Sequence, residues 1–251
     1  MNRIEDYRSV AVDVVGWLCK YANDNNVKSF VVGVSGGIDS AVSSTLAAKT
    51  GLPVYAVGMP LNQKIEQETL SDAHLFWLES LYPNVKKLKA DLSESYAKLM
   101  SDLTKEFTLE YTGNPLAKAN TKSRLRMVTL YHVAANVGGI VVGTGNKVED
   151  YGVGFYTKYG DGGVDIAPIA DLYKTEVWEL GEYLEVDQRI VDADPTDGLW
   201  IDSRSDEEQL GASYAELEEA METGTGPAVE VLKKFNTQNK HKMEPIPTFK
   251  L

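Results

Sequence analysis

The segment VVGVSGGIDS, residues 31–40, places two glycines and three polar side chains directly after an apolar run. Glycines at the end of a buried strand let the backbone turn tightly and approach a ligand, and the amides of such a turn bind phosphate. Ser35 and Ser40 add hydroxyl donors beside Asp39. An unpaired carboxylate would repel a polyphosphate there, so Asp39 indicates a Mg²⁺ ligand. A plain strand-to-helix turn is the alternative.

The common nucleotide fingerprints do not occur in the sequence. A P-loop requires G-x-x-x-x-G-K-[ST], but residues 33–40 contain no lysine, and the residue after Gly143 in GGIVVGTGNK is Thr144. A dinucleotide fingerprint requires G-x-G-x-x-G, and the glycine pairs that begin at Gly143 and Gly152 both lack the last glycine. Transfer of a γ-phosphate or a hydride is therefore not expected.

The elements that must position these residues alternate along the chain. Short apolar runs predict strands at 29–34, 53–59, 85–90 and 139–144. Periodic or capped segments predict helices at 3–24, 39–50, 65–80, 93–106, 114–137, 171–184, 213–222 and 227–235. This order predicts a doubly wound, mainly parallel α/β sheet with helices on both faces. Ligands should then lie beyond the carboxyl ends of the strands, just after Val34, Gly58 and Val142.

Three segments are predicted to lack regular structure. Residues 144–165 are glycine-rich, and residues 192–211 are polar and expected to be mobile. Within the second segment, residues 200–209 carry Trp200 and are predicted to form a lid over the ligand edge. The tail ends in EPIPTF, whose prolines and aromatic residue indicate a segment that docks rather than frays.

The composition is that of an ordinary globular protein. The 251 residues are 43% hydrophobic and 25% charged, with a net charge of −12 and a single cysteine. No apolar run has the length of a signal peptide or a membrane span. The negative charge argues against binding to nucleic acid or to anionic lipid. We therefore expect one domain over 1–251, cytoplasmic, acting on small molecules.

Residues 33–41, GVSGGIDSA, resemble the pyrophosphate-binding loop of the N-type ATP pyrophosphatases, which cleave ATP between the α- and β-phosphates. Five further stretches follow in the order found in NAD synthetases: NTKSRLRM (120–127), VVGTGNKVED (141–150), FYTKYGDGGVDIAPIADLYKTEV (155–177), DPTDGL (194–199) and HK (241–242). This resemblance covers nearly the whole chain. It implies an adenine nucleotide alpha hydrolase-like fold and a ligase that converts deamido-NAD, ATP and ammonia into NAD, AMP and pyrophosphate.

The resemblance also implies roles for individual residues. Contacts to ATP are expected from Gly33, Val34, Ser35, Gly36, Gly37, Ile38, Asp39, Ser40, Thr144, Lys174 and Thr196. Contacts to deamido-NAD are expected from Asn120, Arg124, Lys158, Asp165, His241 and Lys242. The Mg²⁺ ligands would be Asp39 and Glu149, and the catalytic residues Asp39, Lys174 and Asp165. The adenine contacts stay open, because GMPLNQ lacks an arginine that some members carry there, so Met59 and Gln63 are left unassigned.

Some of these residues carry a physical signal of their own. Lys174 falls in the first turn of the helix that Asp171 is predicted to cap, where a cation opposes the helix dipole and so suggests a bound anion. Arg124 and Arg126 lie about 200° apart around their helix, so only one should point inward. We expect Arg124 to bind substrate and Arg126 to form a structural ion pair. Asp165 is expected either to bond the ribose or to orient ammonia.

The length and composition of the chain bear on the source of ammonia and on the competing functions. A glutamine-hydrolysing domain is far longer than the roughly 28 residues before the first strand, so free ammonia or a separate ammonia-delivering protein is expected. A tRNA-modifying sulfur transferase of the same superfamily is the alternative, although one cysteine and the net charge of −12 oppose it. A non-catalytic nucleotide sensor would not need the Asp39, Glu149 and Lys174 set. The resemblance implies a homodimer, with the apolar stripes of helices 3–24 and 114–137 available as its interface.

Overall fold

The computed structural model describes residues 3–196, 198–199 and 205–250. Within these residues, four parallel strands form one sheet in the order β3-β2-β1-β4. The strands are β1 (Ser29–Gly33), β2 (Val54–Gly58), β3 (Val85–Lys89) and β4 (Gly139–Val142). In the register, Phe30 of β1 lies opposite Val54 on one side and Ile140 on the other. A bridge from Val142 to Ile166 extends the sheet. All three strand pairings are parallel, which confirms the predicted parallel α/β class.

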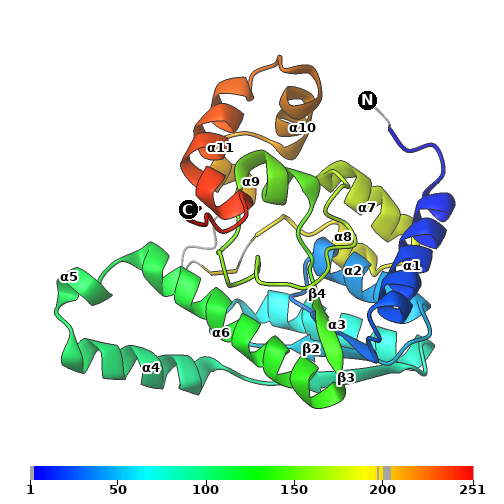
Figure 1. Cartoon of the computed structure of the whole chain (residues 1–251), viewed down its shortest axis with the longest axis horizontal. Helices are drawn as coiled ribbons and strands as arrows, with labels where there is room; N and C mark the ends of the chain where they lie inside the picture. Colours follow the sequence, from blue (N-terminus) through cyan, green and yellow to red (C-terminus); the bar gives the residue numbers. More distant parts are fainter. Residues whose placement is uncertain (1–2, 197, 200–204, 251) are drawn as a thin grey trace.

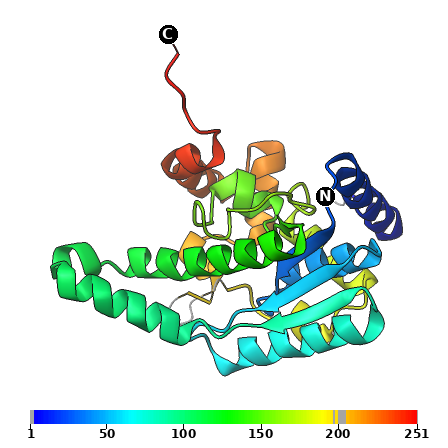
Figure 2. The same cartoon turned by 60° about the horizontal axis from the view of Figure 1, so that its bottom comes forward.

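Helices cover both faces of this sheet (Figure 1 and Figure 2). In chain order the helical elements are α1 (Tyr7–Asp24), α2 (Ile38–Lys49), α3 (Ile65–Leu81), α4 (Ser93–Glu106), α5 (Leu109–Thr112), α6 (Pro115–Val137), η1 (Val148–Val153), α7 (Lys174–Tyr183), α8 (Gln188–Val191), α9 (Asp206–Leu210), α10 (Tyr214–Thr223) and α11 (Val229–Met243). α2 and α3 pack on one face, with α1 and α7 against α2, and α6 packs on the other face. α4, α5 and the start of α6 form an arm that projects from the body (Figure 2).

The packing of the core explains why apolar residues in β1 do not alternate with polar ones. Phe30 and Val32 are fully buried in the cluster that includes α2 and α7, whereas Val31 is buried in the cluster beneath α6. Successive side chains of a strand point to opposite faces, and both faces are covered here. A separate cluster joins η1, α10 and α11 around Tyr214 and Leu217. The helices α10 and α11 of this cluster lie at the top of Figure 1.

Local capping signals explain several helix boundaries. Asn114 accepts hydrogen bonds from the amides of Leu116 and Ala117, and Gly138 ends α6 at φ +61°, as predicted. The prediction that Asp171 caps the next helix is wrong, because α7 begins at Lys174 with Tyr173 as its N-cap. Asp171 instead accepts a hydrogen bond from Lys147 at 2.7 Å.

Two further expectations need correction. Segment 144–165 is not all loop, because residues 148–153 form the π-helical turn η1. The last helix continues to Met243, so His241 and Lys242 lie on α11 rather than in a tail. Asn236, Asn239 and Lys242 donate to backbone carbonyls between residues 151 and 156, which gives the added helical turns a surface to pack on.

The expected lid can be placed only in part. Residues 200–204 lie outside the described residues, and 206–210 form the short helix α9. Ser205 caps α9 by accepting a hydrogen bond from the Glu208 amide at 3.1 Å. None of the helices in the described ranges combines the length and apolarity that crossing a membrane requires.

Candidate active site

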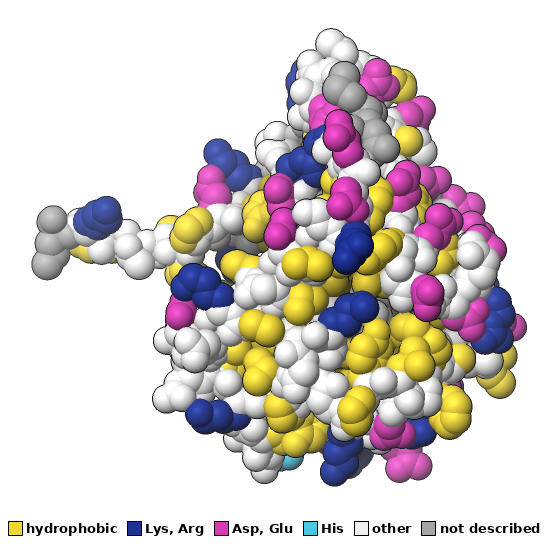
Figure 3. Space-filling model, turned by 90° about the vertical axis from the view of Figure 1, so that its right-hand side faces the viewer, with side chains coloured by type: hydrophobic (Ala, Val, Ile, Leu, Met, Phe, Trp, Pro, Cys, Tyr) yellow, Lys and Arg dark blue, Asp and Glu magenta, His cyan; other side chains and the backbone are white. Residues whose placement is uncertain are grey.

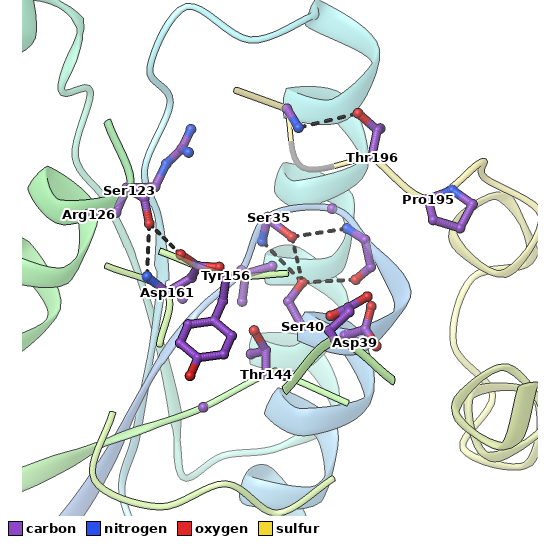
Figure 4. A pocket seen from close by; sticks show the side chains of 18 of the residues that line it. Ser35, Asp39, Ser40, Ser123, Arg126, Thr144, Tyr156, Asp161, Pro195 and Thr196 are labelled. Carbon is purple, nitrogen blue, oxygen red and sulfur yellow. Dashed lines mark hydrogen bonds between the residues drawn. The ribbon is translucent and has the colours of Figure 1, made fainter. Parts of the chain in front are cut away.

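The turn after β1 is held in one shape by its own hydroxyl groups (Figure 4). Ser40 Oγ accepts a hydrogen bond from the Ser35 amide at 3.1 Å and donates to the Gly37 carbonyl at 2.9 Å. Gly36 has φ +94°, and a Cβ there would lie 2.5 Å from the Gln67 carbonyl. Only glycine therefore fits. The turn leads straight into the N-terminus of α2, which favours an anion such as phosphate.

A cavity of about 280 Å³ opens at this turn. Its walls come from the segments that follow β1, β2 and β4 and from residues 193–196, 198 and 199, as expected for the carboxyl edge of a parallel sheet. All the positions predicted to contact ATP line it, namely Gly33, Val34, Ser35, Gly36, Gly37, Ile38, Asp39, Ser40, Thr144, Lys174 and Thr196.

Lys174 and two carboxylates meet in the cavity wall. The Lys174 ammonium lies 2.5 Å from Asp39 Oδ2 and 3.3 Å from Glu149 Oε1, and its side chain is 3% exposed. Burial by itself would lower the pKa of Lys174, but Asp39 and Glu149 hold that pKa above its ordinary value. Burial raises the pKa of Glu149, which the Lys174 charge opposes. The position of Lys174 at a helix N-terminus suggested a bound anion nearby. The negative groups beside it are the carboxylates of Asp39 and Glu149.

Asn146 connects the Asp39 carboxylate to the backbone of the turn that carries Glu149, and sequence reasoning missed it. Its side chain is fully buried. Nδ2 donates to Asp39 Oδ1 at 3.0 Å, while Oδ1 accepts from the amides of Val148 and Glu149 at 3.1 and 3.2 Å. One amide group therefore places Asp39 relative to the turn that carries Glu149. The sequence signal that could have revealed Asn146 is its place as a polar residue four positions after a buried strand, within GTGN.

Two carboxylates beside the turn have the chemistry to hold Mg²⁺. Among the described residues, no group of three or more His, Cys, Asp or Glu side chains is arranged to hold a metal ion. Mg²⁺ is usually held by one or two carboxylates and completes its shell with substrate phosphates and water. Asp39 and Glu149 provide two carboxylates beside the predicted phosphate turn, and a cation, the Lys174 ammonium, already lies between them.

Other parts of the cavity lining carry further acidic and polar groups. Asp161 accepts a hydrogen bond from Ser123 Oγ at 2.6 Å (Figure 4). It also accepts one from the Thr157 amide at 2.9 Å. Burial, reinforced by neighbouring carboxylates, raises the pKa of Asp150 to about 7. A Cβ on Gly145 would lie 2.3 Å from the Asp150 carboxylate, so that glycine makes room for it.

The residues predicted to contact deamido-NAD lie outside the cavity lining, although several adjoin one another. Arg124 Nε donates to the Lys158 carbonyl at 3.3 Å, and Lys158 Nζ donates to the His241 carbonyl at 3.0 Å. Asn120 and Lys242 also bond to this stretch: Asn120 accepts from Thr157 Oγ1 at 2.9 Å, and Lys242 Nζ donates to the Tyr156 carbonyl at 2.8 Å.

Asp165 lies apart from these five residues. It accepts hydrogen bonds from Tyr131 at 3.0 Å and from the Val141 amide at 2.8 Å, and it does not line the cavity. Its position therefore gives no direct support to a catalytic role.

The arginine expected to be structural is the one that reaches the cavity. Arg126 lines it and donates to the Met59 carbonyl at 3.3 Å and to Gln63 Oε1 at 3.0 Å. Arg124 is exposed. The unassigned Met59 and Gln63 line the same wall. The two arginines point to different sides of α6, as predicted, but which of them faces inward depends on how α6 lies on the sheet.

Residues 10–247 match the family model of NAD synthase. A curated NH(3)-dependent NAD(+) synthetase of Carboxydothermus hydrogenoformans is 38% identical over 231 residues, which span 91% of this chain and 92% of that protein. The chain belongs to the NAD synthase family. Another NH(3)-dependent NAD(+) synthetase, from Archaeoglobus fulgidus, is 40% identical over 76% of this chain and 73% of that protein.

Solved structures support the same family. NMN synthetase from Francisella tularensis has a TM-score of 0.87 and 32% identity, over 99% of this chain and 100% of that chain. NAD⁺ synthetase from Burkholderia pseudomallei has a TM-score of 0.75 and 25% identity, over 95% and 90% of the two chains. These neighbours place the sheet in the adenine nucleotide alpha hydrolase-like fold that the resemblance implied.

Proposed function

We propose that this member of the NAD synthase family adenylates the nicotinate carboxylate of deamido-NAD with ATP and Mg²⁺ and then amidates it with ammonia. Membership of the family assigns the chain to NAD synthesis by amidation. The observation that carries the detailed proposal is the cavity, because it gathers the phosphate turn, Thr144, the Lys174 ammonium and two carboxylates at one edge of the sheet.

In the first step a nicotinate carboxylate oxygen attacks the α-phosphorus of ATP. The bond from that phosphorus to its bridging oxygen breaks, and pyrophosphate departs. The amides of the 33–40 turn and the N-terminus of α2 would stabilise the charge on the leaving group. Asp39 and Glu149 would hold Mg²⁺, which neutralises phosphate charge when bound. Lys174 would supply a second positive charge at the same place.

In the second step ammonia attacks the acyl carbon, AMP departs and one proton is released. Little acid–base chemistry is required, so the chain's contribution is to hold the two nucleotides together and to exclude water from the reactive adenylate. Hydrogen bonds link Arg124, Lys158 and the C-terminal end of α11, and this group of residues adjoins the cavity wall at Tyr156. The group is proposed to bind the acceptor nucleotide.

The test is a stoichiometric product analysis. The protein is incubated with ATP, Mg²⁺, ammonium and deamido-NAD, and NAD, AMP and pyrophosphate are measured together. Equal amounts of the three are expected. Release of ADP or orthophosphate in place of AMP and pyrophosphate would refute the proposal. AMP formation that depends on added tRNA would support a tRNA-modifying activity instead.

A second acceptor is favoured by one comparison. The neighbour from Francisella tularensis, with a TM-score of 0.87, is an NMN synthetase. Nicotinate mononucleotide carries the same carboxylate as deamido-NAD without the adenylate half, so the same two steps would give NMN. Measuring kcat/KM for both acceptors under identical conditions decides between them, because the preferred acceptor has the higher ratio.

We also propose a homodimer. Val12 and Trp17 of α1 are 63% and 45% exposed, and Val128 of α6 is 57% exposed. Figure 3 shows hydrophobic side chains gathered on the side of the molecule where α1 lies. Exposed apolar patches of this kind commonly mark protein interfaces. Light scattering at micromolar concentration should give twice the chain mass of 27.6 kDa, and a monomeric mass would contradict the proposal.

A further inference from the structure

Tyr214 lies behind the cavity wall and touches two residues of the site. It is the first residue of α10 and is 1% exposed. Its hydroxyl donates to Glu149 Oε1 at 2.7 Å, and its ring centroid lies 5.0 Å from the Lys174 ammonium. The same hydroxyl is 3.3 Å from Asp206 Oδ2, so its single proton is best placed on the Glu149 bond.

Contacts on the backbone and on the ring hold the Tyr214 side chain in place. The α10 N-terminus is held by a capping box between Ser213 and Glu216, and the Tyr214 amide donates to Glu207 Oε1 at 2.9 Å. The ring packs edge-on against Trp178 at 6.0 Å, within the cluster that joins η1, α10 and α11. A hydroxyl carried on a packed ring with two torsion angles keeps its direction well.

The bond to Glu149 orients a proposed metal ligand. Glu149 is carried on the π-helical turn, where backbone bonds alone do not fix its carboxylate. The hydrogen bonds from Tyr214 and Lys174 both end on Oε1, which leaves Oε2 for a ligand in the cavity. Groups that hydrogen-bond a metal ligand fix its direction, and removing them typically costs about 10- to 100-fold in metal affinity or activity.

We propose that Tyr214 is a positioning residue for the adenylation step: its hydroxyl aims the Glu149 carboxylate at the divalent cation that arrives with ATP. This role rests on the proposed function, because it requires the cation to bind between the carboxylates and the phosphates. The tyrosine does not line the cavity, so its effect passes through Glu149. The ring also supports Lys174 by a cation–π contact, which substitution by phenylalanine keeps.

The test removes only the hydroxyl. Tyr214→Phe keeps the ring packing against Trp178, and Tyr82→Phe removes a hydroxyl from a half-buried ring at the far end of α3 as a matched control. Binding of Mn²⁺ in the presence of ATP is followed by electron paramagnetic resonance without acceptor or ammonia. We expect affinity for Mn²⁺ to fall about 10- to 100-fold in Tyr214→Phe and to stay unchanged in Tyr82→Phe. In kinetics, kcat should fall while KM for ammonia is unchanged.

A double-mutant cycle separates positioning from general packing. In a Glu149→Gln background, Tyr214→Phe should have no further effect on Mn²⁺ affinity, because the carboxylate that it orients is gone. Equal Mn²⁺ affinity in Tyr214→Phe and the unsubstituted protein would overturn the proposal, as would loss of the fold on removing this hydroxyl. If instead the unsubstituted protein forms no AMP from ATP, the proposed function fails. That result can be told apart from equal Mn²⁺ affinity and from loss of the fold, because it appears in the protein without any substitution.

Discussion

His74 on α3 is a buried histidine whose environment has no place for a second proton. It is 1% exposed, and Nε2 lies 3.0 Å from Ser44 Oγ on α2. Ser44 already donates to the Ser40 carbonyl at 2.7 Å, so Nε2 carries the proton of the neutral ring. Nδ1 is buried without a hydrogen-bond partner among the described residues. Burial lowers the pKa of His74 to about 4.

This lowered pKa makes the free energy of unfolding depend on pH. A histidine in the unfolded chain titrates near 6.5. Between pH 6.5 and about 4 the unfolded state binds a proton that the folded state does not, so stability is retained above pH 6.5 and lost as the pH falls. A pKa difference of about 2.5, at about 1.4 kcal/mol for each pKa unit, amounts to about 3 kcal/mol at pH 4 and about 2 kcal/mol at pH 5.

The measurement is urea unfolding of the native chain and of His74→Leu between pH 7.5 and 4.5. Leucine has a similar volume and does not titrate, so most other groups cancel in the comparison. One of these is Asp150, whose raised pKa of about 7 acts in the opposite direction by favouring the folded state as the pH falls. From pH 7.5 to 5 the native chain should lose about 2 kcal/mol more than the variant. Parallel pH profiles of the two proteins would refute the account of His74.

Three other predictions concern the site. Lys174→Met should bind Mn²⁺ about tenfold more tightly than the native chain in the absence of nucleotide, because two buried carboxylates then lack their cation; calorimetry measures this, and weaker binding would contradict it. Gly36→Ala should weaken ATP binding and cost about 1–3 kcal/mol of stability, since its Cβ meets the Gln67 carbonyl at 2.5 Å. Gly51→Ala, also at positive φ but with open space around it, is the control and should leave ATP affinity intact. Asn146→Asp places a like charge beside Asp39 and should lower kcat about 10- to 100-fold with little change in acceptor KM; an unchanged rate would show that the Asn146 bond is dispensable.

The local sequence predicts the tight turn after β1 and the positions of the strands well, because both depend on neighbouring residues. The apolar run before Ser35, the glycine at 36 and the helix after it each act over a few positions. The caps at Asn114 and Gly138 are similarly local, and both were predicted. The prediction that Asp171 caps α7 is wrong because α7 begins only at Lys174, where the amide of the N-cap residue Tyr173 donates to the Glu176 carboxylate at 2.8 Å.

What the sequence determines by itself is the order of strands and helices and the turn that can hold phosphate. These follow from side-chain periodicity and from backbone freedom at glycine, which need no distant partner. What only the tertiary structure decides is which polar groups meet. Lys174 reaches Asp39 across 135 residues, and Tyr214 reaches Glu149 across 65. The direction of Arg126 into the cavity likewise depends on how α6 packs on the sheet. Such pairings arise because folding the sheet brings the ends of separate strands to one edge, and no local pattern in the chain records which side chains will face each other there.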